Sequence, residues 1–351
     1  MGLGLIVTVN GRDDNELAAA TMVEVQERMG QPTTYTLHYP ADISEGDLPL
    51  LSDARLDAGS EITLSVPTSA DTVCLVKGPV SGQQIHFQHG GEGSSLAVQG
   101  ADTAITLDRE VKSQVWAGLT DSDAVSAILG NYGFMADVES TSAGHFEDKH
   151  TLIQRQSDFQ FIQQLARRNG YLFWISCDAM GIETAHFKRP PLGGSSSAEL
   201  IINLDPPNIE QLELSWDVER ATSVEAVQLD LNQLSDINGG VAQTPLDLLG
   251  GNGLADITGD TRSQYLTAPS DDGGDLQSRG EGSLIDSGWF VRASCQTTYE
   301  QLGSVIRAHS LVDLRGAGQR HSGQYFVCAV HHVIDAVSHR MEIELIRNAW
   351  E

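Results

Sequence analysis

The sequence QRQSDFQFIQQLARRNGYLF, residues 154–173, predicts a helix that runs directly into a buried strand. Ser157, with Gln160 three residues later, fits the capping-box pattern of a helix start. Apolar side chains in the middle recur at the spacing of one helical face, and two arginines occupy the last turn, where the helix dipole favours cations. Gly170 takes the C-cap position, and the aromatic run that begins at Tyr171 is typical of a buried strand.

A second helix is expected just upstream of this stretch. Thr120 is a suitable N-cap, and the aspartates at positions 121 and 123 suit the positive end of a helix dipole. Glycines at positions 130 and 133 end the apolar pattern. The two helices together predict a helix-containing segment over residues 113–190.

Short alternating strands, separated by turn residues, fill both flanks of this segment. One set covers residues 1–112. Another covers residues 191–351. It begins within a stretch at 189–197 that is rich in proline, glycine and serine, which predicts a linker or a long loop. The spacing indicates antiparallel barrels or sandwiches, and therefore a mainly β protein of the α+β class with a few helices.

Two parts of the second β-rich unit carry more specific expectations. Residues 238–282 are rich in glycine and aspartate with few aromatics, which predicts a long surface loop. Residues 297–309 read as a short helix.

Composition excludes several classes of protein. The chain has 351 residues, and its 21 basic and 48 acidic residues give a net charge of 21 − 48 = −27. A protein that coats DNA needs a basic patch, and no apolar run reaches the roughly 18–20 residues of a membrane-spanning helix. The start does not resemble a secretion signal. Three interpretations of the charge remain open: a soluble surface, adaptation to high salt, or an acidic channel lining.

The four cysteines, Cys74, Cys177, Cys295 and Cys328, are far apart, and no pair has CxxC spacing. All lie beside strand-like apolar residues, where a free cysteine packs as a small hydrophobe. We therefore expect free thiols and synthesis in a reducing compartment.

Motifs for chemistry are lacking in the sequence. There is no nucleotide-binding glycine loop, no nucleophile elbow and no HExxH zinc motif. His331, His332, Asp335 and His339 form the densest cluster of metal-ligating types. Neighbouring residues on a strand point to opposite faces, so the histidine pair is not expected to converge on one ion. The sequence predicts no catalytic residue, no cofactor and no metal site.

The stretch at 154–173 resembles the signature of the phage late control D family, the hub proteins of contractile-tail baseplates. The same hub forms the first part of type VI secretion spike proteins. The signature positions that match are Ser157, Asp158, Phe159, Phe161, Leu165, Gly170 and Tyr171.

This resemblance implies a structural protein and not an enzyme. It implies two tube-like antiparallel β-barrel units flanking a small helical segment. Three copies would form a pseudo-hexameric ring joining a hexameric tail tube to a trimeric central spike, with other baseplate proteins around it. DNA or cargo would pass the lumen without specific binding, and nothing would anchor the ring in a membrane. The length implies a hub whose spike is a separate protein. The protein would be made in the host cytoplasm and reside in a virion tail baseplate or in the baseplate of an injection particle.

Two other classes remain open from the sequence. An acidic β-rich adhesin or carbohydrate-binding protein would also lack catalytic motifs, but it should expose aromatics on loops. A hydrolase with a scattered carboxylate site is the other class, because the two catalytic carboxylates of a β-rich enzyme can lie far apart in the sequence and form no motif.

Overall fold

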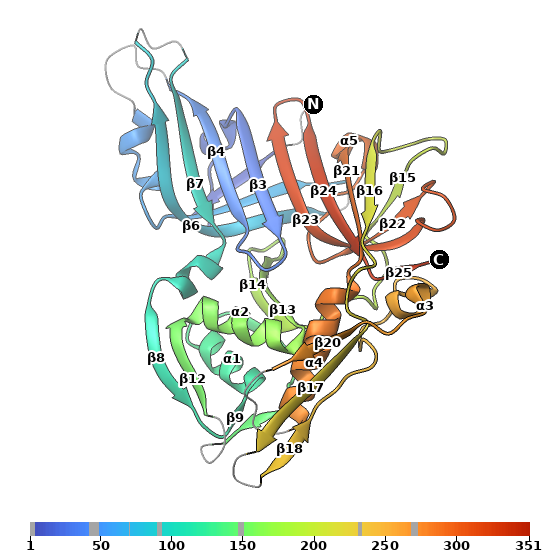
Figure 1. Cartoon of the computed structure of the whole chain (residues 1–351). Helices are drawn as coiled ribbons and strands as arrows, with labels where there is room; N and C mark the ends of the chain where they lie inside the picture. The colour runs from blue at the N-terminus through green and yellow to red at the C-terminus, as the bar shows by residue number, and fades with distance from the viewer. Residues whose placement is uncertain are drawn as a thin grey trace.

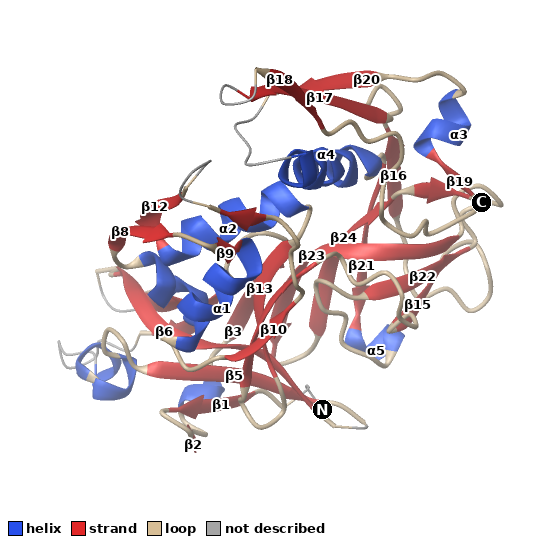
Figure 2. Cartoon of the chain, turned by 90° about the horizontal axis from the view of Figure 1, so that it is seen from below, coloured by secondary structure: helices blue, strands red, loops and turns tan. Residues whose placement is uncertain are grey.

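The computed structural model describes residues 4–41, 49–69, 71–89, 93–146, 151–230, 234–267 and 273–351. Strands dominate these residues and pair mostly antiparallel, with a few helices set beside them (Figure 2). The expected α+β class is therefore confirmed. None of the helices in these ranges is long and apolar enough to cross a membrane.

One long sheet joins the two ends of the chain. Its main path runs β16-β21-β24-β23-β3-β4-β7-β6-β5-β1-β2, and β22 and β15 branch from β23. The strands are β1 (Ile6–Val9), β2 (Arg12–Asp13), β3 (Met22–Arg28), β4 (Thr34–Pro40), β5 (Glu61–Pro67), β6 (Thr72–His86), β7 (Ser95–Ala101), β15 (Ala198–Ile201), β16 (Leu212–Trp216), β21 (Val291–Thr298), β22 (Leu311–Arg315), β23 (Gly323–Asp335) and β24 (His339–Arg347). Pairing of β3 with β23 places blue and red strands side by side in Figure 1, so the two β-rich units share one sheet.

The sheet bends sharply within β6. The first half of this strand pairs with β5 and the second half with β7, and the register shifts between Val80 and Gly82. A bulge of this kind bends a strand and increases its twist. Among the described residues the pairing path ends at β2 and at β16, so the expected closure into barrels is not detected.

Alternation along the strands decides which face is buried. On β3, Val23 and Val25 are buried whereas Glu24 and Gln26 are not. The same period of two recurs on β4, β21 and β24. One face of the sheet therefore packs on hydrophobic cores, one for each β-rich unit, and the other face is polar.

The helical segment has a core of its own. Helix α1 (Asp121–Gly130) begins at Thr120, whose hydroxyl accepts from the Asp123 N–H at 3.2 Å while the Asp123 carboxylate accepts from the Thr120 N–H at 3.1 Å. Helix α2 (Asp158–Asn169) ends at Gly170 with φ +67°. Both predicted caps are confirmed. The accompanying strands are β8 (Val111–Trp116), β9 (Leu119–Thr120), β10 (Met135–Val138), β11 (Gly144–His145), β12 (Leu152–Ser157), β13 (Leu172–Cys177) and β14 (Glu183–Lys188).

The prediction of one long loop at 238–282 is wrong for the described part of that range; residues 268–272 lie outside it. The remaining elements are β17 (Ser223–Asp230), β18 (Ser235–Asn238), β19 (Asn252–Gly253), α3 (Leu254–Thr258), β20 (Ser263–Leu266), α4 (Gly273–Gly288), α5 (Tyr299–Leu302) and β25 (Ala349–Trp350), with 3-10 turns η1 (Leu17–Ala19), η2 (Pro49–Ser52), η3 (Ala54–Leu56) and η4 (Thr103–Asp108). The prediction failed because glycine content was taken as a sign of a loop, whereas glycines inside α4 allow neighbouring groups to pack closely against the helix. A Cβ on Gly280 would lie 2.9 Å from the Val241 side chain. The helix expected at 297–309 is only the single turn of α5.

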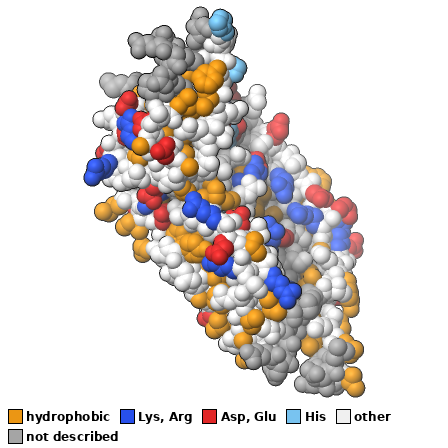
Figure 3. All heavy atoms as spheres, turned by 90° about the vertical axis from the view of Figure 1, so that its left-hand side faces the viewer, with side chains coloured by type: hydrophobic (Ala, Val, Ile, Leu, Met, Phe, Trp, Pro, Cys, Tyr) orange, Lys and Arg blue, Asp and Glu red, His pale blue; other side chains and the backbone are white. Residues whose placement is uncertain are grey.

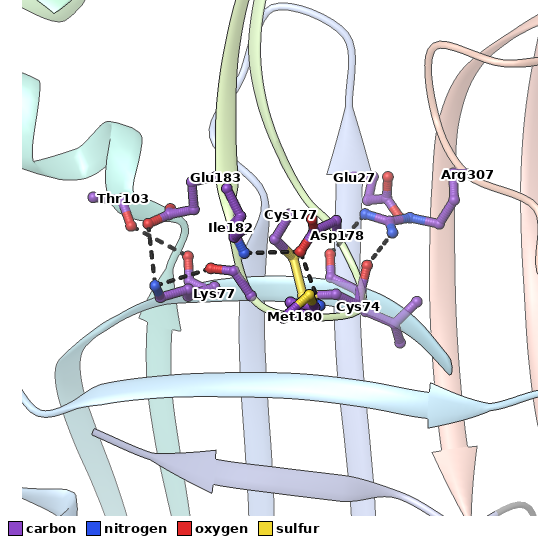
Figure 4. The surroundings of a disulfide bond; sticks show 12 residues. Glu27, Cys74, Lys77, Thr103, Cys177, Asp178, Met180, Ile182, Glu183 and Arg307 are labelled. Carbon is purple, nitrogen blue, oxygen red and sulfur yellow. Dashed lines mark hydrogen bonds and ion pairs between the residues drawn. A yellow bond between two sulfur atoms is a disulfide. The ribbon is translucent and has the colours of Figure 1, made fainter. Parts of the chain in front are cut away.

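The cysteine prediction is half wrong. Cys74 and Cys177 form a disulfide, with their Cα atoms 5.8 Å apart (Figure 4). Cys295 and Cys328 are free and buried, as expected. The two bonded residues are 103 positions apart in sequence, and only the packing of the β13–β14 hairpin against β6 brings them together.

Candidate functional site: the polar face of the long sheet

The polar face of the long sheet lies opposite the hydrophobic cores. Strand register places its side chains on one surface across seven neighbouring strands. They are Glu24, Gln26 and Arg28 on β3, Thr34, Thr36 and His38 on β4, Gln99 on β7, Glu213 and Ser215 on β16, Arg292, Ser294 and Gln296 on β21, His331 on β23, and Arg340, Glu342 and Glu344 on β24. We call this set the polar face.

Ion pairs cross between its strands. Arg28 donates to both carboxylate oxygens of Glu344, at 2.7 and 3.2 Å. His331 lies between Glu24 and Glu342, with nitrogen–oxygen distances of 3.2 and 3.3 Å. The side chains of these pairs are about a third to a half exposed, so water and salt screen them and each contributes little to stability.

The net charge of the polar face is close to neutral. Its four glutamates face three arginines, which gives 3 − 4 = −1 with both histidines neutral. Most of the chain's charge of −27 therefore lies elsewhere. Two open hollows of about 620 and 270 Å³ lie along the face, the first beside Arg292 and the second beside Arg28 and Glu342.

A buried ionic cluster lies behind the polar face. The Arg307 Nε donates to Glu27 at 2.5 Å, and His332 Nε2 lies 3.1 Å from the same carboxylate. Burial alone would raise the pKa of Glu27, but Arg307 and His332 outweigh it and lower that pKa to about 2. Burial lowers the pKa of His332, and it lowers the pKa of its neighbour His339 to about 3.

The two adjacent histidines face opposite ways, as predicted. His331 lies on the polar face, whereas His332 is fully buried and its Nδ1 lies 2.9 Å from His339 Nε2. His339 lies at the start of β24. Within the described ranges, no three or more histidine, cysteine or acidic side chains are grouped to hold a metal ion.

The signature residues lie together, but in the helical segment and not on the polar face. Ser157 caps α2 by accepting from the Gln160 N–H at 3.2 Å, and its hydroxyl donates to Asp108. Asp158 is buried and accepts from Lys112 at 2.5 Å, Tyr132 at 2.7 Å and Gln154 at 2.7 Å. Burial would raise the pKa of Asp158, but these hydrogen bonds lower it overall.

The other signature residues build the core around α2. Phe159 packs edge-on against Phe173, Phe161 stacks on Trp116, and Leu165 is fully buried. Tyr171 packs against Phe187 and donates to the carbonyl of Ser140 at 3.2 Å. Their arrangement serves folding, and it positions this segment below the sheet (Figure 1).

A serine–histidine–aspartate network was missed from the sequence. Ser176 Oγ lies 2.8 Å from His186 Nε2, and His186 Nδ1 lies 2.8 Å from Asp137, because β13, β14 and β10 are neighbouring strands. Trp174 stacks on the imidazole at 4.5 Å, and Lys188 shares the half-exposed Asp137 carboxylate. Ser176 lines neither of the two hollows of the polar face. We therefore interpret the network as structural.

The outer surface of the helical segment is partly apolar. The β8–β12 ribbon exposes Val111, Val115 and Ile153, with exposed fractions of 75, 56 and 43%. Figure 3, which views this side of the molecule, shows hydrophobic side chains among interspersed acidic and basic ones.

Comparison with solved structures defines the class of fold. The 43 kDa tail protein of prophage MuSo2 from Shewanella oneidensis superposes with a TM-score of 0.70 at 14% identity, covering 99% of both chains. A tail protein from Neisseria meningitidis gives 0.68 at 13% identity, covering 100% of this chain and 98% of that one. An Escherichia coli component of the type VI secretion system gives 0.60 at 13% identity, covering 97% and 76%. The chain has the fold of phage tail proteins.

Sequence comparison then gives the family. Residues 3–336 match the family described as the Alg8 N-terminal domain, and the chain belongs to that family. The description names a domain and states no activity. A search of curated proteins found no match.

Proposed function

We propose that this chain is a structural hub protein in the baseplate of a contractile tail or contractile injection system. The single observation that carries the proposal is the long bent sheet, which runs through both β-rich units and presents one continuous polar face. The fold shared with phage tail proteins and a type VI secretion component supports the same role. Such a protein acts through assembly, and it needs neither a cofactor nor a catalytic residue.

Three copies would form the ring. Each copy contributes two β-rich units, so a trimer has six, which matches a hexameric tail tube on one side and a trimeric spike on the other. The described residues pair β16 only with β21, so the outer edge of β16 is free to extend the sheet into a neighbouring copy. Trp216 on this strand is 49% exposed.

The polar face would line the lumen of this ring. Its ion pairs leave a net charge near zero, so DNA or a protein cargo would meet neither a strong attraction nor a strong repulsion. This differs from an acidic lining, which the composition alone had left open. Passage without specific binding follows from short-range, mutually compensated charges.

The division into three parts also belongs to the proposal. Residues 1–112 and 191–351 would be the two tube-like units, and residues 113–190 the helical segment between them. Three hydrophobic cores support a division into three parts, although Ala104 and Leu107 pack in the core of the helical segment and Ile334 packs in the core of the first unit.

Measurement of the molar mass in solution tests the assembly, with the chain alone and mixed with tube and spike proteins encoded beside it. We expect a trimer, or a complex with those partners. Trp216→Glu should give monomers, because it puts a charge at the proposed edge. Val337→Glu is the matched control, since Val337 is 82% exposed in the turn after β23. A chain that stays monomeric and binds neither partner would refute the hub.

A further inference from the structure

Three parts of the chain meet at two consecutive residues of β6. Cys74 is bonded to Cys177, which ends β13 in the helical segment. Arg307, from the second β-rich unit, donates through its guanidinium to the carbonyls of Cys74 and Leu75, the latter at 2.8 Å. Figure 4 shows the disulfide and Arg307 beside each other on β6. The first β-rich unit is thus held at one point by both other parts.

Besides the disulfide, Lys77 of β6 contacts the β13–β14 hairpin near this point. Lys77 Nζ donates to the Gly181 carbonyl at 3.1 Å and lies 3.6 Å from Glu183. The Lys77 and Glu183 side chains are 21 and 11% exposed. The hairpin tip itself is open to solvent, with Met180 85% and Ile182 45% exposed. The disulfide is the covalent attachment of this tip to β6, alongside the contacts of Lys77.

The four cysteines differ in how accessible and how reactive their thiols are toward an oxidant. Cys295 and Cys328 are buried separately, and burial raises the pKa of their thiols to about 12 and about 11, which suppresses the reactive thiolate. Cys177 lies at the start of an exposed tip and is only half-buried, with Cys74 directly behind it. An oxidant can reach this pair alone.

We propose that Cys74 and Cys177 form an oxidation-dependent clamp, which fixes the helical segment to the first β-rich unit once the protein leaves a reducing compartment. The oxidant is a small-molecule disulfide of the glutathione type. The Cys177 thiolate attacks it and releases one thiol; the Cys74 thiolate then attacks the mixed disulfide and releases the second. Two thiols lose two electrons and two protons, and one disulfide is reduced to two thiols.

The clamp rests on the proposed function only for the stage at which the protein leaves the reducing compartment. Its formation can therefore be tested with the isolated protein. The full chain is equilibrated in oxidised or in reduced glutathione, its thiols are alkylated under native conditions, and its peptides are mapped without reduction. We expect a cross-linked 74–177 peptide in oxidised buffer and two alkylated cysteines in reduced buffer. Cys295 and Cys328 should be modified only after unfolding.

Two further readouts distinguish a clamp from an incidental bond. Reduction should lower the Tm by about 5 °C or more, because the bridge closes a long loop. It should also speed proteolysis at the 178–182 tip. Cys177→Ser should show both effects in oxidised buffer, whereas Cys328→Ala should keep the cross-link and its redox response.

Three results would overturn the clamp: free thiols at both positions in oxidised buffer, a cross-link that persists in reduced glutathione, or a cross-link whose loss changes neither Tm nor tip proteolysis. None of these depends on whether the chain forms a trimer. Failure of the clamp and failure of the hub are therefore separate outcomes.

Discussion

Gly170 and Gly282 meet backbone to backbone where α2 ends against α4. A Cβ built on Gly282 would lie 2.8 Å from the Gly170 nitrogen and 2.9 Å from the Arg167 carbonyl oxygen. A Cβ on Gly170 would lie 2.4 Å from the Ile285 side chain, and its φ of +67° already favours glycine. The C-cap residue of α2 and a glycine of α4 thus dock the helical segment onto the second β-rich unit without intervening side chains.

Gly282→Ala should therefore destabilise the fold although alanine favours helices. The added methyl group has to displace backbone atoms, which costs about 1–3 kcal/mol. Gly288→Ala, in the same helix with open space around it, should be neutral or slightly stabilising. Denaturant unfolding of both variants measures the difference, and equal stability would contradict the close contact.

Asp158→Asn should weaken the start of α2 at neutral pH. The carboxylate accepts three hydrogen bonds, and loss of its charge should cost about 2 kcal/mol of unfolding free energy. Because folding lowers the pKa of Asp158 below 3.8, its contribution is complete above that pH and fades as the pH falls through the folded value. The variant and the parent should thus converge in acid. Gln160→Ala, on the exposed side of the same helix, is the control.

Arg307→Met should leave the buried Glu27 carboxylate without its main partner. Removal of one member of a buried ion pair typically costs about 3–5 kcal/mol. The folded pKa of Glu27 is about 2 against an ordinary 4.5, so the stability gained from this pair is present above pH 4.5 and is lost as the pH falls towards 2. Chemical denaturation between pH 2 and 7 should show the deficit of the variant shrinking in acid.

A surface pair provides the matched control for that experiment. Arg315 is 56% exposed and lies 2.7 Å from Glu199, so Arg315→Met should change stability by about 0.5 kcal/mol or less. If Arg307→Met and Arg315→Met lower the free energy of unfolding equally, the burial of the Arg307–Glu27 pair does not add to its stabilising effect.

Charge reversal on the polar face should affect passage and not folding. Glu24→Lys, Glu342→Lys and Glu344→Lys together turn a balanced surface strongly basic, which should retain DNA or an acidic cargo in the assembled particle and slow its ejection. The same three changes at the exposed Glu210, Glu219 and Glu300 are the control. Equal ejection rates for the two triple variants would contradict the proposal that the polar face lines the lumen.

Local signals in the sequence determined the elements of the helical segment. Thr120, Ser157 and Gly170 act on backbone groups within a few residues, so their roles as caps could be predicted from neighbouring positions alone. Alternation such as Val23-Glu24-Val25-Gln26 likewise determined which side of each strand is apolar, and it was the one available signal for the polar face.

Only the tertiary structure decided how these elements meet. The pairing of β3 with β23 joins residues about 300 positions apart, and the Cys74–Cys177 bond and the Gly170–Gly282 contact join segments about 100 apart. A glycine that ends a helix and a glycine that allows two helices to pack closely cannot be distinguished in the sequence. The part of α4 within residues 238–282 was therefore predicted as a loop. Such contacts depend on the shape of both partners at once, and no stretch of sequence contains both.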